Sequence, residues 1–116
     1  MPAHIELGEK GEQLAVNYLR ALHYSILETN WRWQKAEVDI IAQIDQTLVF
    51  VEVKTRSYDT VSKPEEAVHL KKQQLLKNAA EAYCEQQALH LELRFDIIAI
   101  IKAQGKTSTK HIQSAF

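Results

Sequence analysis

The sequence predicts one α/β domain over residues 1–116, built from a mixed sheet flanked by helices. Three observations support this fold class. Short segments are rich in β-branched residues, two longer segments repeat apolar residues at helical spacing, and a chain of 116 residues has the length of a single domain. Hydrophobic residues make up 46% of the chain and charged residues 25%, which is typical of a globular protein.

The elements are expected in the order α-β-β-β-α-β, followed by a short last strand. Leu14, Tyr18 and Leu22 are spaced by four residues, which predicts the first helix. Pro64 suits the first turn of a second, long helix. The expected helices are residues 4–22 and 64–87, and the expected strands are residues 24–31, 37–44, 47–54, 91–101 and 109–113.

The two central strands are separated only by residues 45–46, which predicts a tight antiparallel hairpin. Counting back from this turn places Asp39 opposite Glu52, on a face shared with apolar side chains. Two carboxylates there are costly unless their charge is offset, and Mg²⁺ or Mn²⁺ would offset it. Lys54 follows Glu52 on the same face, where it would lie opposite Glu37. A ladder of charges on a solvent-facing strand is the alternative interpretation.

Two helical residues favour the site over the charge ladder. Glu12 falls within the apolar stripe of the first helix, where a carboxylate is costly without a partner, and Glu9 lies near the edge of that stripe. Lys72 falls on the inner stripe of the second helix. Its ammonium group could extend to water or reach a functional site. We therefore keep Glu12 and Lys72 as candidate site residues, with Glu9 and Glu37 as secondary candidates.

The charge balance excludes some classes of protein. The net charge is −1, which excludes a polybasic nucleic-acid arm. Residues 1–53 hold four basic and eight acidic residues, a balance of −4, and residues 54–116 hold ten and seven, a balance of +3. Cys84 is the single cysteine, so an internal disulfide is excluded. Neither a membrane span nor a signal peptide is recognisable, so we expect a cytoplasmic protein with no membrane partner.

Several motifs together carry a family pattern. They are Gly8-Glu9-Lys10-Gly11-Glu12, Glu37-Val38-Asp39-Ile40-Ile41, Phe50-Val51-Glu52-Val53-Lys54-Thr55-Arg56, Asn30-Trp31-Arg32 and Arg94-Phe95-Asp96. In these motifs the chain resembles the YraN-like family of bacterial proteins. That family is similar to the PD-(D/E)xK nuclease superfamily and to archaeal Holliday junction resolvases. One position departs from the pattern, because Ala36 stands where the family usually has glycine, and a positive φ there would strain an alanine.

The resemblance implies a restriction-endonuclease-like αβββαβ core and a Mg²⁺-dependent nuclease that hydrolyses phosphodiester bonds, with branched DNA as a candidate substrate. It implies that Asp39 and Glu52 bind Mg²⁺ or Mn²⁺, that Glu12 completes the metal site, and that Lys54 is the catalytic lysine. Lys72 matches a basic helical residue near such sites.

Other expectations concern partners. Arg56 directly follows the motif, and with Lys72 it would contact phosphate in a nucleic acid, with DNA favoured over RNA. A homodimer would extend the small binding surface. Two other functions remain open: a non-catalytic nucleic-acid-binding or assembly module on the same fold, and a protein-interaction domain that uses Trp31 and Trp33.

Overall fold

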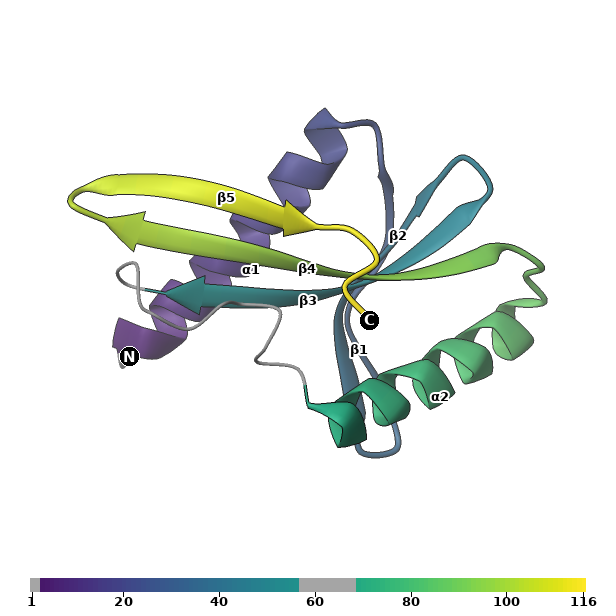
Figure 1. The fold of residues 1–116 in the computed structure, drawn as a ribbon. Coiled ribbons are helices and arrows are strands. Elements are labelled where there is room, and N and C mark those ends of the chain that lie inside the picture. Colours follow the sequence, from purple (N-terminus) through teal and green to yellow (C-terminus); the bar gives the residue numbers. More distant parts are fainter. Residues whose placement is uncertain (1–2, 57–68) are drawn as a thin grey trace.

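The computed structural model describes the backbone of residues 3–56 and 69–116, and the side chains of residues 10–56 and 69–116. Two helices and five strands follow one another along the chain, as Figure 1 shows. They are α1 (Ala3–Ala21), β1 (Ser25–Trp33), β2 (Ala36–Ile44), β3 (Thr47–Arg56), α2 (Leu70–Gln87), β4 (Glu92–Ala103) and β5 (Lys106–Ile112). This is the predicted order, including the last strand.

The five strands form one mixed sheet in the order β1-β2-β3-β4-β5. Every neighbouring pair is antiparallel except β3 and β4, which run parallel on either side of the crossover that contains α2. The sheet and its two helices match the restriction-endonuclease-like αβββαβ architecture expected from the sequence.

Among the described residues, helix α2 begins at Leu70. Its N-cap is His69, whose backbone is extended with φ −72° and ψ 159°. The predicted start at Pro64 lies outside the described residues. The strand expected at residues 109–113 is longer than predicted, because β5 pairs with β4 from Lys106 to Ile112.

A helix covers each face of the sheet. Helix α1 packs against one face, in a cluster that includes Leu19, Ile40, Val51 and Ile98. Helix α2 packs against the other face, where Leu76 and Tyr83 meet Phe50. Figure 1 shows the two helices on opposite sides of the strands. Because side chains alternate along a strand, each residue of β3 faces one helix or the other.

The central hairpin forms in the predicted register, with Ile44 opposite Thr47 and Ile41 opposite Phe50. Asp45 turns the chain with φ +50°, a conformation that aspartate tolerates. The backbone of Ala36 has no positive φ; the left-handed residue of the preceding turn is Gln34, at φ +54°. The alanine at the family's glycine position is therefore unstrained.

Among the described residues, no helix is both long enough and apolar enough to cross a membrane.

Candidate active site

Asp39 lies where the hairpin ladder ends. The last backbone pair is Ile40 with Val51, one step short of the predicted pair of Asp39 with Glu52. Beyond that point the Asp39 side chain replaces a backbone acceptor, because its Oδ2 accepts a hydrogen bond of 2.8 Å from the backbone N–H of Val53. This bond ties the carboxylate of β2 to the strand that carries Glu52 and Lys54.

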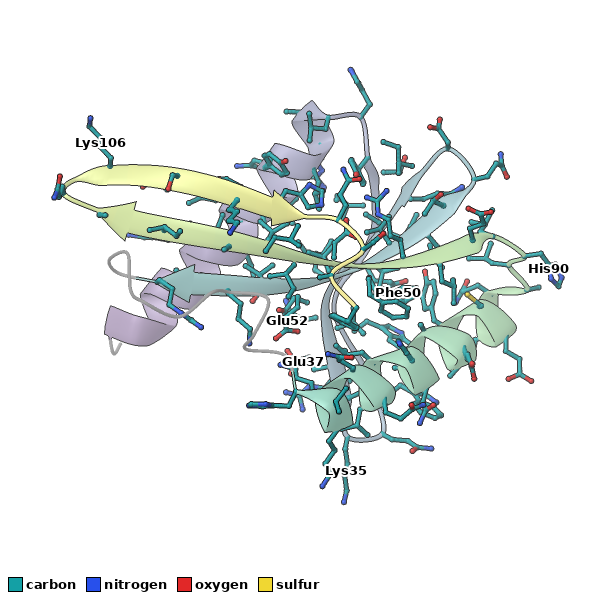
Figure 2. The ribbon with its side chains drawn as sticks, viewed as in Figure 1. Lys35, Glu37, Phe50, Glu52, His90 and Lys106 are labelled. Carbon is teal, nitrogen blue, oxygen red and sulfur yellow. The ribbon has the colours of Figure 1, made fainter. Side chains whose placement is uncertain are left out.

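Glu52 is a buried carboxylate held by two lysines. The residue is 6% exposed and shares a face with Phe50, on the α2 side of the sheet. Its Oε1 lies 2.5 Å from Nζ of Lys72 and 3.2 Å from Nζ of Lys54. Figure 2 shows Glu52 between β3 and the first turns of α2. Lys72 thus reaches the predicted site instead of extending only to water.

The two carboxylates interact across the end of the hairpin. The pKa of Asp39 is raised from 3.8 to about 7, first by burial, then by the negative charge of Glu52 and, less strongly, by that of Glu12. The hydrogen bond from Val53 and the charge of Lys72 act in the opposite direction. The structure therefore brings Asp39 within electrostatic reach of both Glu52 and Glu12. The lysines offset the charge of Glu52 more fully than that of Asp39.

A close approach between α1 and β3 positions Glu12. A Cβ atom at Gly11 would lie 2.1 Å from Oγ1 of Thr55, so only glycine allows the helix to lie this near the strand. Glu12 is the next residue, and its Oε1 is buried. Glu9 lies one turn earlier on α1, but its side chain is outside the described residues.

The donors fit a hard divalent cation in chemical type, because Mg²⁺ and Mn²⁺ prefer carboxylate oxygens. Burial and a raised pKa at Asp39 are also features expected of a site that gains stability when a cation arrives. Within residues 10–56 and 69–116, however, no three acidic, histidine or cysteine side chains are grouped closely enough to hold an ion as they stand. Ligation by Asp39, Glu52 and Glu12 together would need their side chains to move.

One predicted contact differs in the structure. Glu37 pairs with Arg32 of β1, with Nη2 to Oε2 at 2.9 Å, and not with Lys54 as the hairpin count predicted. The count failed because the β2–β3 ladder stops at Ile40, so residue 37 is paired through β1 alone. Arg56 donates a hydrogen bond of 3.1 Å from Nη1 to the carbonyl oxygen of Thr55.

The two tryptophans of β1 pack against the core on the α2 side. The Trp31 ring makes an edge-to-face contact with Tyr83, with centroids 5.1 Å apart. Both tryptophans remain half-buried, and Trp33 lines a shallow pocket of about 210 Å³ with Leu75. Core packing therefore accounts for much of their surface.

A second charged cluster lies on the opposite face of the sheet. Asp96 is fully buried and pairs with Arg94 (2.9 Å) and His111 (2.7 Å), whose ring also lies 3.1 Å from the hydroxyl of Tyr18. Hydrogen bonds from His111 and Arg94 outweigh burial and hold the pKa of Asp96 below 3.8.

Asp96 is the neighbour of Val51 in the sheet, so it faces α1, away from Glu52. The cluster ties β4 and β5 to α1. The sequence did not reveal His111 as the partner of Asp96.

Comparisons with known proteins agree with this picture at the level of the family. Residues 11–100 match the model of the "Uncharacterised protein family UPF0102". A UPF0102 protein of Christiangramia forsetii is 53% identical over all of this chain and 98% of its own length. One of Flavobacterium psychrophilum is 48% identical over the same shares of both chains, and one of Thermodesulfovibrio yellowstonii is 43% identical over 98% of each. The chain therefore belongs to the UPF0102 family, the YraN-like family that its motifs resemble.

Proposed function

We propose that this protein is a metal-dependent nuclease that hydrolyses phosphodiester bonds in nucleic acid, with DNA as the favoured substrate. The observation that carries the proposal is the group of charged residues at the end of the β2–β3 hairpin. A half-buried aspartate with a pKa near 7 lies beside a buried glutamate that is in contact with two lysines. Perturbed carboxylates next to a positioned lysine are typical of hydrolytic sites.

Asp39 and Glu52 would hold Mg²⁺ or Mn²⁺, and Glu12 would complete the site from α1. The bound cation would polarise a phosphoryl oxygen and lower the pKa of a water molecule. Asp39 must lose its proton to act as a ligand, so its raised pKa makes cation binding pH-dependent. The hydrogen bond from the N–H of Val53 to Oδ2 would restrain the orientation of the Asp39 carboxylate.

Lys54 is the residue best placed to act on the attacking water. Its side chain is only 18% exposed, and its Nζ is held 3.2 Å from Oε1 of Glu52. An ammonium group fixed beside the carboxylates would orient the water and stabilise the charge that develops on the phosphate. Lys72 is more exposed, at 42%, and is free to exchange Glu52 for a phosphate oxygen. Arg56 would contribute a further phosphate contact from the end of β3.

Cleavage of labelled single-stranded, duplex and branched DNA and of RNA, in Mg²⁺ or Mn²⁺ and in EDTA, tests the proposal. We expect cleavage that needs the metal and is abolished in Asp39→Asn and in Lys54→Met. Asp45→Asn is the matched control, because the same exchange is made in an exposed turn of the same hairpin. Absence of cleavage of every substrate would contradict the proposal, and so would equal cleavage by the Asp39→Asn protein, which would point to a contaminating nuclease.

A second candidate function is a non-catalytic nucleic-acid-binding module. The observation that favours it is the pair of lysines on Glu52, because they offset its charge without a metal ion. This function predicts nucleic-acid binding that is the same in EDTA and in Mn²⁺ and is unaffected by Asp39→Asn. Titration of the protein with DNA under both conditions distinguishes it from the nuclease, for which binding should strengthen when metal is added.

A further inference from the structure

The terminal hairpin β4–β5 carries positive charge and no negative charge along its outer part. From residue 97 to residue 112 the charged side chains are Lys102, Lys106 and Lys110, and neither aspartate nor glutamate occurs there. Figure 1 shows this hairpin extending away from α2, toward the turn at residues 104–105. Among the described strands β5 pairs only with β4, so its outer side is the edge of the described sheet.

The sheet register joins this hairpin to the candidate active site. Lys54 pairs with Ala99, and Ala99 pairs with Lys110, so the three residues form one row across β3, β4 and β5. Residues paired in this way point to the same face of a sheet, and two strand spacings separate the Cα atoms of Lys54 and Lys110 by about 10 Å. Ala99 is small and buried, so no bulky side chain separates the two lysines.

The same face continues along β5 to the tip of the hairpin. Lys106 lies four residues before Lys110 and therefore on the same face of the strand. Both lysines are exposed, and Ser108 lies between them on that face. The fourth lysine of this region, Lys102, points to the α1 face instead, since Thr107 is its partner in β5.

We propose that the basic row formed by Lys54, Lys110 and Lys106 binds the sugar-phosphate backbone of the nucleic-acid strand that occupies the site. This inference rests on the proposed function and adds a direction to it, because the strand would leave Glu52 across β4 and follow β5 toward the hairpin tip. Phosphates repeat at short intervals along a strand, and a file of lysines without carboxylates matches such a polyanion. The lysines would position the substrate and would not select its sequence.

The test removes the two outer lysines, which take no part in the proposed chemistry. Lys106→Gln with Lys110→Gln is compared with Arg20→Gln with Lys35→Gln. All four residues are exposed, and both double variants remove the same amount of charge. Figure 2 shows Lys35 far from Lys106, at the bottom of the view, with Lys106 at the upper left. Binding of labelled duplex DNA is measured by fluorescence anisotropy in EDTA, so that metal-dependent cleavage does not interfere, over a series of salt concentrations.

Removing one lysine–phosphate interaction lowers the dependence of log K on log salt by about one, so the slope for the Lys106/Lys110 variant should fall by about two. The factor by which the Lys106/Lys110 variant binds DNA more weakly than the unmodified protein should decrease roughly tenfold between about 50 and 200 mM salt. The Arg20/Lys35 variant should keep the slope of the unmodified protein. Thermal unfolding should be the same for all three proteins, because the exchanged side chains are exposed.

The remaining outcomes separate failure of the basic-row proposal from failure of the nuclease proposal. An unchanged salt slope in the Lys106/Lys110 variant would overturn this inference, while metal-dependent cleavage by the unmodified protein would leave the nuclease assignment intact. An equal decrease of the slope in the two variants would also overturn it, since the effect would then be one of net charge. Loss of binding to phosphatidylserine vesicles with unchanged DNA binding would assign the row to a lipid surface instead.

Discussion

Substitution of Asp39 by asparagine should stabilise the metal-free protein while abolishing its response to metal. The pKa of Asp39 is raised from 3.8 to about 7, chiefly by burial and by Glu52. A shift of about three units corresponds to about 4 kcal/mol of unfavourable free energy for the ionised form, at about 1.4 kcal/mol per unit. Asparagine keeps an oxygen that can accept the hydrogen bond from Val53, but it carries no charge.

The gain in stability should depend on pH in a defined window. In the folded state Asp39 retains its proton up to about pH 7, whereas in the unfolded chain it loses the proton near pH 3.8. Between these values the folded state binds more protons, so the unmodified protein loses stability as the pH rises. The advantage of Asp39→Asn should therefore be absent below about pH 4, grow up to about pH 7 and then level off, with about 4 kcal/mol as its upper limit.

Urea unfolding in EDTA at a series of pH values measures this difference, with Asp45→Asn as the control for the same exchange on the surface. Addition of Mn²⁺ at pH 8 should then stabilise the unmodified protein and leave Asp39→Asn unchanged. A stability difference that is zero at pH 8, or one that is the same at pH 4 and pH 8, would refute the electrostatic reasoning.

Two further substitutions test the surrounding structure. Gly11→Ala should cost about 1–3 kcal/mol of unfolding free energy, because the added Cβ would clash with Thr55. The same substitution should weaken metal binding, because it would displace Glu12. Adding Thr55→Ala to the Gly11→Ala protein should recover part of both losses. Asp96→Asn should cost about 3 kcal/mol at pH 7, since it leaves the charge of Arg94 without its carboxylate partner. This cost in urea unfolding should decrease as the pH falls below 3.8, where the unfolded chain binds a proton at Asp96 that the folded protein, with its lowered pKa, does not yet bind. A cost below about 0.5 kcal/mol for either change would contradict the assigned contact.

The sequence predicted the order of the elements and the register of the central hairpin, because both depend on local signals. The two-residue turn at residues 45–46 sets the register, and it brought Asp39 and Glu52 near each other. The apolar stripe of α2 likewise placed Lys72 on the side of the sheet, where it meets Glu52. These inferences needed only the periods of strands and helices.

Contacts that depend on departures from regular structure could not be predicted in this way. The Asp39 side chain replaces a backbone partner at the end of a ladder, and a count of alternating residues assumes that the ladder continues. Glu37 lies opposite Arg32 across the turn at residues 34–35, a pairing of β1 with β2 that a count along the β2–β3 hairpin does not consider.

Contacts between residues far apart in the chain could not be predicted from the sequence either. Tyr18 and His111 are 93 residues apart in the sequence and meet only because α1 crosses β5. The row of Lys54 and Lys110 likewise requires the parallel register of β3 and β4, which no local signal encodes.

Calorimetric titration of the metal-free protein with Mn²⁺ near pH 7 tests the central claim most directly, that Asp39 and Glu52 form a metal site. We expect saturable binding that strengthens as the pH rises, releases protons from Asp39 and is abolished in Asp39→Asn but not in Asp45→Asn. Absence of binding by the unmodified protein, or equal binding by the Asp39→Asn protein, would contradict it.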